Sequence, residues 1–166
     1  ASCLVGSEMC IRDRSYSIKK DLNKRLETAE KALELNPSHP RSNFSYGQAL
    51  TNFGRNEEAL SYINKAIEMD PQSKKNYEGF FPLLYIALKD WENAITWLNT
   101  AHERSPHSRY FGWKAAVYGK MNDLESAKEN LNSFLKERPE IKTLEDYEKV
   151  CLLYTSPSPR DKRQYR

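Results

Sequence analysis

Residues that could do chemistry are few in this 166-residue chain, and their spacing is not that of a known reactive site. The histidines His39, His102 and His107 do not form a zinc-binding spacing such as His-Glu-x-x-His, and we expect His102 on the exposed side of a helix. Two pairs of adjacent acids, Glu57–Glu58 and Glu145–Asp146, stand where the helix dipole favours acids, in the expected first turns of helices. No glycine cluster that could hold a phosphate and no Gly-x-Ser-x-Gly elbow occurs. The sequence therefore predicts no catalytic residue, no metal or other cofactor and no enzyme activity.

The composition argues against several classes of protein. Charged residues make up 30% of the chain and the mean hydropathy is −0.83, which is typical of a soluble protein. The longest uncharged apolar run, residues 79–88, is about half of the roughly 20 residues that a membrane span needs. The net charge is only +3, and basic residues alternate with acidic ones, so that no basic patch for nucleic acid is expected. We therefore expect a cytoplasmic protein that binds no membrane, no nucleic acid and no small-molecule substrate.

The two ends, residues 1–14 and 151–166, differ in kind from the rest of the chain. A DNA sequence that encodes CLVGSEMCIRDR, residues 3–14, can encode CLLYTSPSPRD on its opposite strand, and this is the sequence of residues 151–161. Such an inverted repeat resembles the translated adapter of transposase-based sequencing libraries. We interpret both ends as non-native, adapter-derived segments and exclude them from the fold argument.

Residues 15–150, between these ends, have 20 basic and 20 acidic side chains and no cysteine. Their net charge is therefore zero, and neither a disulfide nor a thiolate metal site is expected. Because a sequencing fragment would set both limits, we expect this segment to be part of a longer protein.

A repeated phrase that ends in proline organises this segment. Prolines close the similar phrases KALELNP, KAIEMDP, NTAHERSP and SFLKERP, at Pro37, Pro71, Pro106 and Pro139, which are nearly evenly spaced. In the second unit, one apolar pattern ends at Gly54, where a left-handed residue can end a helix. A second pattern at helical spacing follows, formed by Ala59, Tyr62, Ile63, Ala66 and Ile67. A period of about 34 residues predicts a solenoid of helix-turn-helix units.

These units resemble the tetratricopeptide repeat (TPR), whose motif places small residues in both helices, glycine at the turn and proline at the end. The matching positions are Gly47, Gly54, Ala59, Ala66 and Pro71 in the second unit, Tyr85, Ala94, Ala101 and Pro106 in the third, and Ala115, Tyr118, Asn122, Ala127 and Pro139 in the fourth. The resemblance implies an all-α fold, a TPR-type right-handed α-solenoid of about three and a half repeats. Its expected parts are a half repeat at 16–37, repeats at 40–71, 75–106 and 108–139, and a truncated capping helix at 143–150.

Several positions depart from the motif, most of them in the third unit. Pro82 takes the small-residue position of its first helix and should kink or shorten that helix. Lys89–Asp90 replaces the turn glycine there, whereas Asn122, at the turn of the fourth unit, tolerates the left-handed conformation. Phe134 replaces the late alanine of the fourth unit.

The capping helix is predicted from the residues that follow Pro139. Thr143-Leu-Glu-Asp146 is an N-cap signal with acids in the first turn. Leu144, Tyr147 and Val150 then recur at helical spacing.

In TPR arrays the first helices of the repeats line a concave groove that holds a peptide or a helix. By resemblance, the groove residues are Arg41, Phe44, Gln48 and Thr51 in the second unit, Asn76, Phe80, Leu83 and Ile86 in the third, and Arg109, Trp113 and Ala116 in the fourth. The third unit is apolar there, so the Lys, Asn and Arg set that clamps a C-terminal carboxylate is missing. A hydrophobic helix fits better as the partner, with Phe44, Leu83 and Trp113 as anchors. The alternative occupant is the missing N-terminal part of the same protein.

Two functions remain open at this point. The first is a non-catalytic protein–protein interaction scaffold that binds a peptide or helix in its groove. The second is the C-terminal regulatory or oligomerisation TPR region of a longer signalling protein. The phrases SPHSRYFGWKAAVYGKMNDLESAKENL and SFLKERPEIKTLEDYEKV resemble such regions in bacterial class III adenylate/guanylate cyclase proteins. Similar arrays also follow winged-helix DNA-binding domains.

Overall fold

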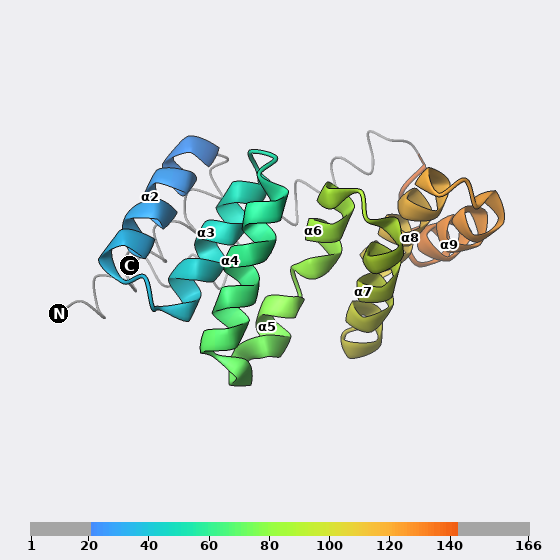
Figure 1. Ribbon diagram of the computed structural model, residues 1–166. Helices are drawn as coiled ribbons and strands as arrows, with labels where there is room; N and C mark the ends of the chain where they lie inside the picture. The colour runs from blue at the N-terminus through green and yellow to red at the C-terminus, as the bar shows by residue number, and fades with distance from the viewer. Residues whose placement is uncertain (1–20, 143–166) are drawn as a thin grey trace, which may run out of the picture.

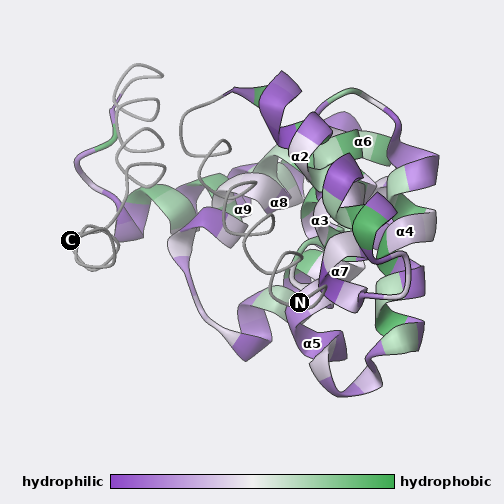
Figure 2. Ribbon diagram, turned by 90° about the vertical axis from the view of Figure 1, so that its left-hand side faces the viewer, coloured by the Kyte–Doolittle hydropathy of each residue, from purple (hydrophilic) through white to green (hydrophobic). Residues whose placement is uncertain are grey.

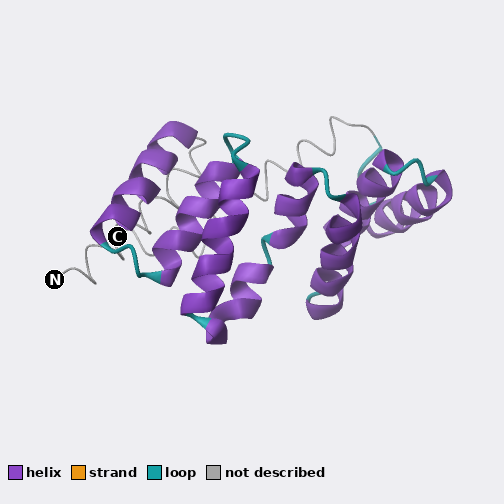
Figure 3. Ribbon diagram, viewed as in Figure 1, coloured by secondary structure: helices purple, strands orange, loops and turns teal. Residues whose placement is uncertain are grey.

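The computed structural model describes residues 21–142, in which helices follow one another in a row and are joined by short turns (Figures 1 and 3). The described helices are α2 (Leu22–Leu35), α3 (Pro40–Thr51), α4 (Asn56–Met69), a 3₁₀ turn (Pro71–Ser73), α5 (Lys74–Glu78), α6 (Phe81–Leu88), α7 (Trp91–Arg104), α8 (Ser108–Lys120) and α9 (Leu124–Glu137). Within these residues there is no strand, and no helix is both long and apolar enough to cross a membrane. The predicted capping helix at 143–150 and both end segments lie outside the described residues.

The helices are arranged in pairs, as the repeat predicts. The second, third and fourth units form the pairs α3–α4, α6–α7 and α8–α9. Each pair is joined to the one before it, because α2 packs on α3, α4 packs on α6 and α7 packs on α8. α2 is the first described helix and lies within the half repeat expected at 16–37. The expected all-α solenoid is therefore confirmed.

The periodic prolines end the second helix of each unit. The residue before each proline leaves the helical conformation while its N–H still bonds to the carbonyl four residues back, as at Asn36, Asp70, Ser105 and Arg138. A proline disfavours the helical conformation of the residue that precedes it, which explains this common end point. Three α-helices share a common start. An aspartate side chain accepts a hydrogen bond from the backbone N–H of the residue three positions later, at Asp21, Asp90 and Asp123.

The turn inside each unit requires one left-handed residue. Gly54 has φ of 72° and Asn122 has φ of 62°, as predicted from the motif. Lys89, which replaces glycine in the third unit, adopts the same conformation with φ of 60°. The turn geometry is therefore kept even where the side chain does not favour it.

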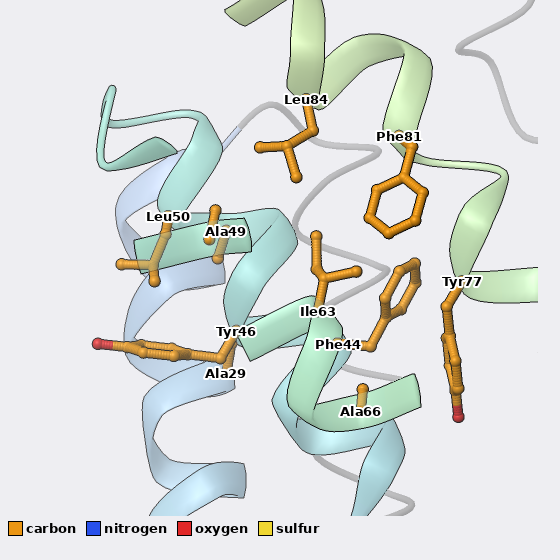
Figure 4. Close-up of a cluster of buried hydrophobic side chains, with 11 residues drawn as sticks. Ala29, Phe44, Tyr46, Ala49, Leu50, Ile63, Ala66, Tyr77, Phe81 and Leu84 are labelled. Carbon is orange, nitrogen blue, oxygen red and sulfur yellow. The ribbon is translucent and has the colours of Figure 1, made fainter. Parts of the chain in front are cut away.

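The core is built where small residues allow two helices to approach closely. A Cβ added to Gly47 on α3 would lie 2.9 Å from the carbonyl oxygen of Ala59 and 2.8 Å from Cγ1 of Ile63, both on α4. Only glycine fits this crossing without a shift of its neighbours. Figure 4 shows the surrounding cluster, in which large side chains of the second and third units meet over alanines of the first and second; it includes Ala29, Phe44, Tyr46, Ala49, Leu50, Ile63, Ala66, Tyr77, Phe81 and Leu84.

The third unit is interrupted as its proline predicts. Its first helix is divided into α5 and α6, and Pro82 lies in the first turn of α6, where a missing N–H costs little. The segment between them, Gly79–Phe80, connects two short helices in place of one long helix. α6 is largely hydrophobic along its length (Figure 2). Its apolar side chains therefore face both the core and the surface.

Candidate protein-binding surface

The predicted groove residues on α3 differ widely in what they offer a partner. Phe44 is only 4% exposed, and its ring lies 4.9 Å from Tyr77 and 6.2 Å from Phe80, measured between ring centroids. The expectation that Phe44 is a surface anchor is therefore wrong: the next unit covers its ring. Arg41 is exposed, and its guanidinium lies over the same ring at 5.4 Å from the centroid.

The two polar groove residues of α3 already have partners within the array. Gln48 accepts a hydrogen bond of 3.4 Å from Arg25 on α2. The hydroxyl of Thr51 donates to the carbonyl of Gly47, one turn earlier on α3. Both residues are half-buried.

Three of the four residues predicted in the third unit are apolar. Leu83 is 41% exposed, while Phe80 and Ile86 are half-buried on either side of it in the sequence. Phe80 comes directly before α6, and Leu83 and Ile86 follow on α6 at spacings of three; we call these three residues the apolar row of α6. Asn76, on α5, is exposed.

The residues predicted on α8 begin with a cation stacked on two aromatic rings. The guanidinium of Arg109 lies 5.1 Å from the ring centroid of Tyr110 and 5.8 Å from that of Trp113. Trp113 is half-buried and meets Tyr110 edge to face, with 5.8 Å between ring centroids. Ala116, one turn further along α8, is exposed. The structure thus brings Arg109 and Trp113 together, as it brings together Phe44 and Phe80.

Sequence reasoning missed a buried carboxylate next to this surface. Glu78, at the end of α5, has a side chain only 6% exposed. It accepts a hydrogen bond of 3.0 Å from Arg104 on α7, and the ammonium of Lys74 lies 3.5 Å from its other oxygen. The ion pair fastens α5 to α7 across the interruption in the helix. Glu78 lies in the region expected to form the first helix of the third unit, but no residue spacing points to a partner on another helix.

A tyrosine next to that carboxylate was missed as well. Tyr77 is buried beside Phe44, and its hydroxyl donates to Asp70 at 3.4 Å. Burial, together with the negative charge of Asp70, raises the pKa of Tyr77. In the sequence, Tyr77 could have been noticed because it follows shortly after Pro71, where the first helix of the third unit is expected to begin.

At the junction between α7 and α8, one expectation proves wrong and a second buried charge is found. His102 is not on an exposed side: it is half-buried, with its ring 4.7 Å from Phe111 and 5.9 Å from Tyr110, between centroids. Lys114 is buried, lies over the Phe111 ring at 5.0 Å and donates to Asn99 at 3.3 Å. Burial lowers the pKa of Lys114, because it disfavours the charged form.

The arrangement offers recognition by shape and apolar contact. Within residues 21–142, no three histidine, cysteine or acidic side chains come together as a metal site would require. The features available to a partner are the apolar row of α6 and the arginines stacked on rings at α3 and α8. We call these residues, Arg41, Phe80, Leu83, Ile86, Arg109 and Trp113, the candidate surface.

Comparison with known proteins defines the class of fold. Residues 26–74 match the family model of the tetratricopeptide repeat. This match covers most of α2 and the whole of the α3–α4 pair, and solved structures similar to the chain are also TPR proteins. The resemblance to the tetratricopeptide repeat is confirmed.

Particular proteins of this kind share only low sequence identity with the chain. The curated Protein CTR9 homolog of Arabidopsis thaliana is 28% identical over 126 residues, and the chain spans 12% of that protein's length. MamA of Desulfovibrio magneticus RS-1 superposes with a TM-score of 0.65 at 16% identity, covering 82% of this chain and 78% of MamA. PilF of Pseudomonas aeruginosa gives 0.64 at 17% identity, with coverages of 84% and 64%. At these identities the structural matches show the fold alone.

A further structural match is to a TPR domain solved with a partner. The TPR2B domain of yeast Sti1, in a complex with pHsp70, superposes with a TM-score of 0.50 at 20% identity, covering 83% of this chain and 99% of the domain.

Proposed function

We propose that this chain is a non-catalytic scaffold that binds a peptide or a helix of another protein across the first helices of its repeats. The observation that carries the proposal is the apolar row of α6, in which Leu83 is exposed between half-buried Phe80 and Ile86. A single exposed leucine is ordinary on a protein surface. A row of three on the first helix of a stacked repeat is where such arrays carry their binding face.

The charges beside this row indicate which partner would fit. Arg41 and Arg109 are exposed, and each lies over an aromatic ring, so their guanidinium groups are held on α3 and α8. A partner with apolar side chains in its middle and carboxylates towards its ends would complement this pattern. The Sti1 domain, solved in complex with pHsp70, supports the general use of this fold in binding proteins.

The test compares two exposed leucines on different helices. Peptides are first selected from a random library against the full chain, and their affinities are measured for Leu83→Asp and for Leu124→Asp, which lies on α9. We expect Leu83→Asp to weaken binding at least about tenfold, because a charge replaces a central apolar contact. Leu124→Asp should leave the affinity unchanged. Equal affinities for the two variants, both folded by circular dichroism, would contradict the proposed site.

A second candidate function places the same surface inside a longer protein. This candidate is favoured by the curated Protein CTR9 homolog, because the matched region makes up only 12% of that protein's length. The array would then be a C-terminal regulatory or oligomerisation region, and an upstream adenylate/guanylate cyclase or winged-helix domain would supply the occupant of the surface. A longer natural chain that contains residues 15–150 would bind the selected peptides at least about tenfold more weakly than residues 1–166 do. Undiminished binding would exclude this candidate.

A further inference from the structure

Two of the helices that open a repeat begin at a histidine. The N-cap of α3 is His39, and Nδ1 of its ring accepts a hydrogen bond of 3.2 Å from the backbone N–H of Ser42. The N-cap of α8 is His107, and its Nδ1 accepts a hydrogen bond of 3.1 Å from the backbone N–H of Arg109. Both histidines have an extended backbone and are half-buried. At both positions an imidazole replaces the hydroxyl, amide or carboxylate that usually caps a helix.

The two histidine caps are equivalent in the repeat. His39 and His107 lie the same number of residues before Pro71 and Pro139, the prolines that close their units. The third unit has Lys74 at this position, as the first residue of the short helix α5. The histidine cap therefore belongs to the two units whose first helix is not interrupted.

A cap of this kind requires a neutral ring. A neutral imidazole has one nitrogen with an available lone pair, whereas both nitrogens of the protonated ring carry a hydrogen and can only donate. Protonation therefore breaks the hydrogen bond from the backbone N–H to Nδ1. It also places a positive charge at the end of the helix where the dipole favours a negative one. The starts of α3 and α8 are thus sensitive to acid in the range in which histidine titrates.

The surroundings of His107 strengthen this sensitivity. Burial of the ring lowers the pKa of His107, and the positive charges of Arg109 and Arg138 lower it further, against the opposite effect of Glu137. Protons therefore bind more readily to the unfolded chain than to the folded one. The stability that this cap supplies is full above the ordinary pKa of histidine and is lost as the pH falls through the lowered pKa.

The charges around His39 are arranged in a related way. Arg41 follows it by two positions, as Arg109 follows His107. The end of α4 packs against the start of α3, because the side-chain nitrogen of Asn43 lies 3.8 Å from the sulfur of Met69. Asp70 comes directly after this methionine, and its carboxylate accepts two hydrogen bonds from the segment that follows it.

We propose that His39 and His107 form a pH switch, in which protonation of the two rings removes the caps and opens the first turns of α3 and α8. The helix α9, capped by Asp123, stays closed over the same range. Hydrogen bonds from Ser126 lower the pKa of Asp123 and so keep its carboxylate charged. The switch acts on turns that carry two arginines of the candidate surface, but it does not depend on the proposed function.

Hydrogen exchange of single backbone amides, measured by NMR on the full chain, tests the switch without a partner. Rates at about pH 8 and about pH 5, on either side of the histidine range, are corrected for the intrinsic effect of pH. We expect the protection of the Ser42 and Arg109 N–H groups to fall at least about fivefold at the lower pH, as when a helix cap is lost. The N–H of Ser126, which bonds to Asp123, is the internal control and should keep its protection.

Two variants assign the effect to the histidines. Asparagine is a good N-cap that does not titrate, so His39→Asn and His107→Asn should keep the helix starts protected at the higher pH. His39→Asn should remove the pH response of Ser42 and leave that of Arg109. His107→Asn should do the reverse.

Three results would overturn the proposal. The first is equal protection of Ser42 and Arg109 at both pH values. The second is a pH response that survives in the helix whose histidine is replaced, which would assign it to another group. The third is an equal loss at Ser126, which would mean that acid loosens the array as a whole.

Discussion

The pairs α3–α4 and α8–α9 are two copies of one repeat unit, with the third unit between them. At one pair of equivalent positions, the first copy has a large residue on its first helix and a small residue on its second, and the other copy has the reverse. In the first pair α3 supplies the buried ring of Phe44 and α4 supplies Ala66, in the same cluster (Figure 4). In the second pair α8 supplies Gly112 and α9 supplies Phe134. A Cβ at Gly112 would lie 3.4 Å from the Phe134 ring. Each pair therefore places one aromatic ring and one small residue at equivalent positions.

The exchange indicates that the aromatic ring can stand on either helix of the pair, with a small residue at the equivalent position of the other helix. Volume-conserving changes cost a core less than changes that open or overfill it. The two pairs differ in their surroundings as well: α3–α4 lies between α2 and α6, whereas among the described residues α8–α9 has a neighbouring pair only on the side of α7. The same substitution should therefore cost more in the first pair than in the second.

The largest effect is expected at the crossing of α3 and α4. Ala59→Arg should destabilise the array by about 4 kcal/mol or more, because Ala59 is fully buried opposite Gly47, where α3 and α4 cross. The equivalent substitution in the last pair, Ala127→Arg, should cost less, since Ala127 is only half-buried. Urea unfolding followed by circular dichroism measures both. Glu68→Arg, on an exposed side of α4, is the control, and equal stability of Ala59→Arg and Glu68→Arg would contradict the repeat register.

The next largest effect is expected from removing the ring of the last pair. Phe134→Ala should cost about 3 kcal/mol, because a buried aromatic side chain is lost against a glycine that cannot fill the space. Phe44→Ala removes the corresponding ring from the first pair and should cost at least as much. The same unfolding measurement compares them. A cost under about 1 kcal/mol for Phe134→Ala would mean that the ring does not fill a core position.

The smallest effect is a gain in stability at Lys114. This residue is equivalent to Tyr46, which is buried and meets Tyr62 edge to face at 4.8 Å between ring centroids. Lys114→Met should stabilise the array by about 1 kcal/mol, since it removes a buried charge whose hydrogen bond to Asn99, at 3.3 Å, is long. Tyr46→Met is the matched change in the first pair and should destabilise.

The advantage of Lys114→Met should depend on pH. The pKa of Lys114 is lowered in the folded chain, so on raising the pH the folded state releases its proton before the unfolded state does. The advantage should be full below this lowered pKa and shrink as the pH rises through it. An advantage that grows with pH would contradict the burial argument.

Most of the fold could be predicted from the sequence because its determinants are local. A proline restricts the residue before it, an aspartate caps the helix that follows it, and a turn that requires positive φ favours Gly54 and Asn122. The interruption at Pro82 was predicted for the same kind of reason. Each of these effects acts within a few residues of its cause.

The candidate surface could be predicted only in part because exposure depends on contacts between units. Phe44 occupies a groove position of the repeat, yet Tyr77 and Phe80 of the next unit cover it. The sequence shows that Phe134 replaces the usual alanine. The space for its ring is provided by Gly112, which lies on another helix and could not be paired with Phe134 from the sequence.

The register of the repeats and the candidate surface both depend on one claim, that the units are equivalent when their closing prolines are aligned. The double variant Gly112→Phe/Phe134→Ala tests it directly, because it rebuilds the order of Phe44 and Ala66 in the last pair. Urea unfolding should show the double variant to be at least about 1 kcal/mol more stable than Phe134→Ala alone, which is a coupling expected only of residues in contact. A double variant as unstable as the two single changes added together would contradict the equivalence of the units.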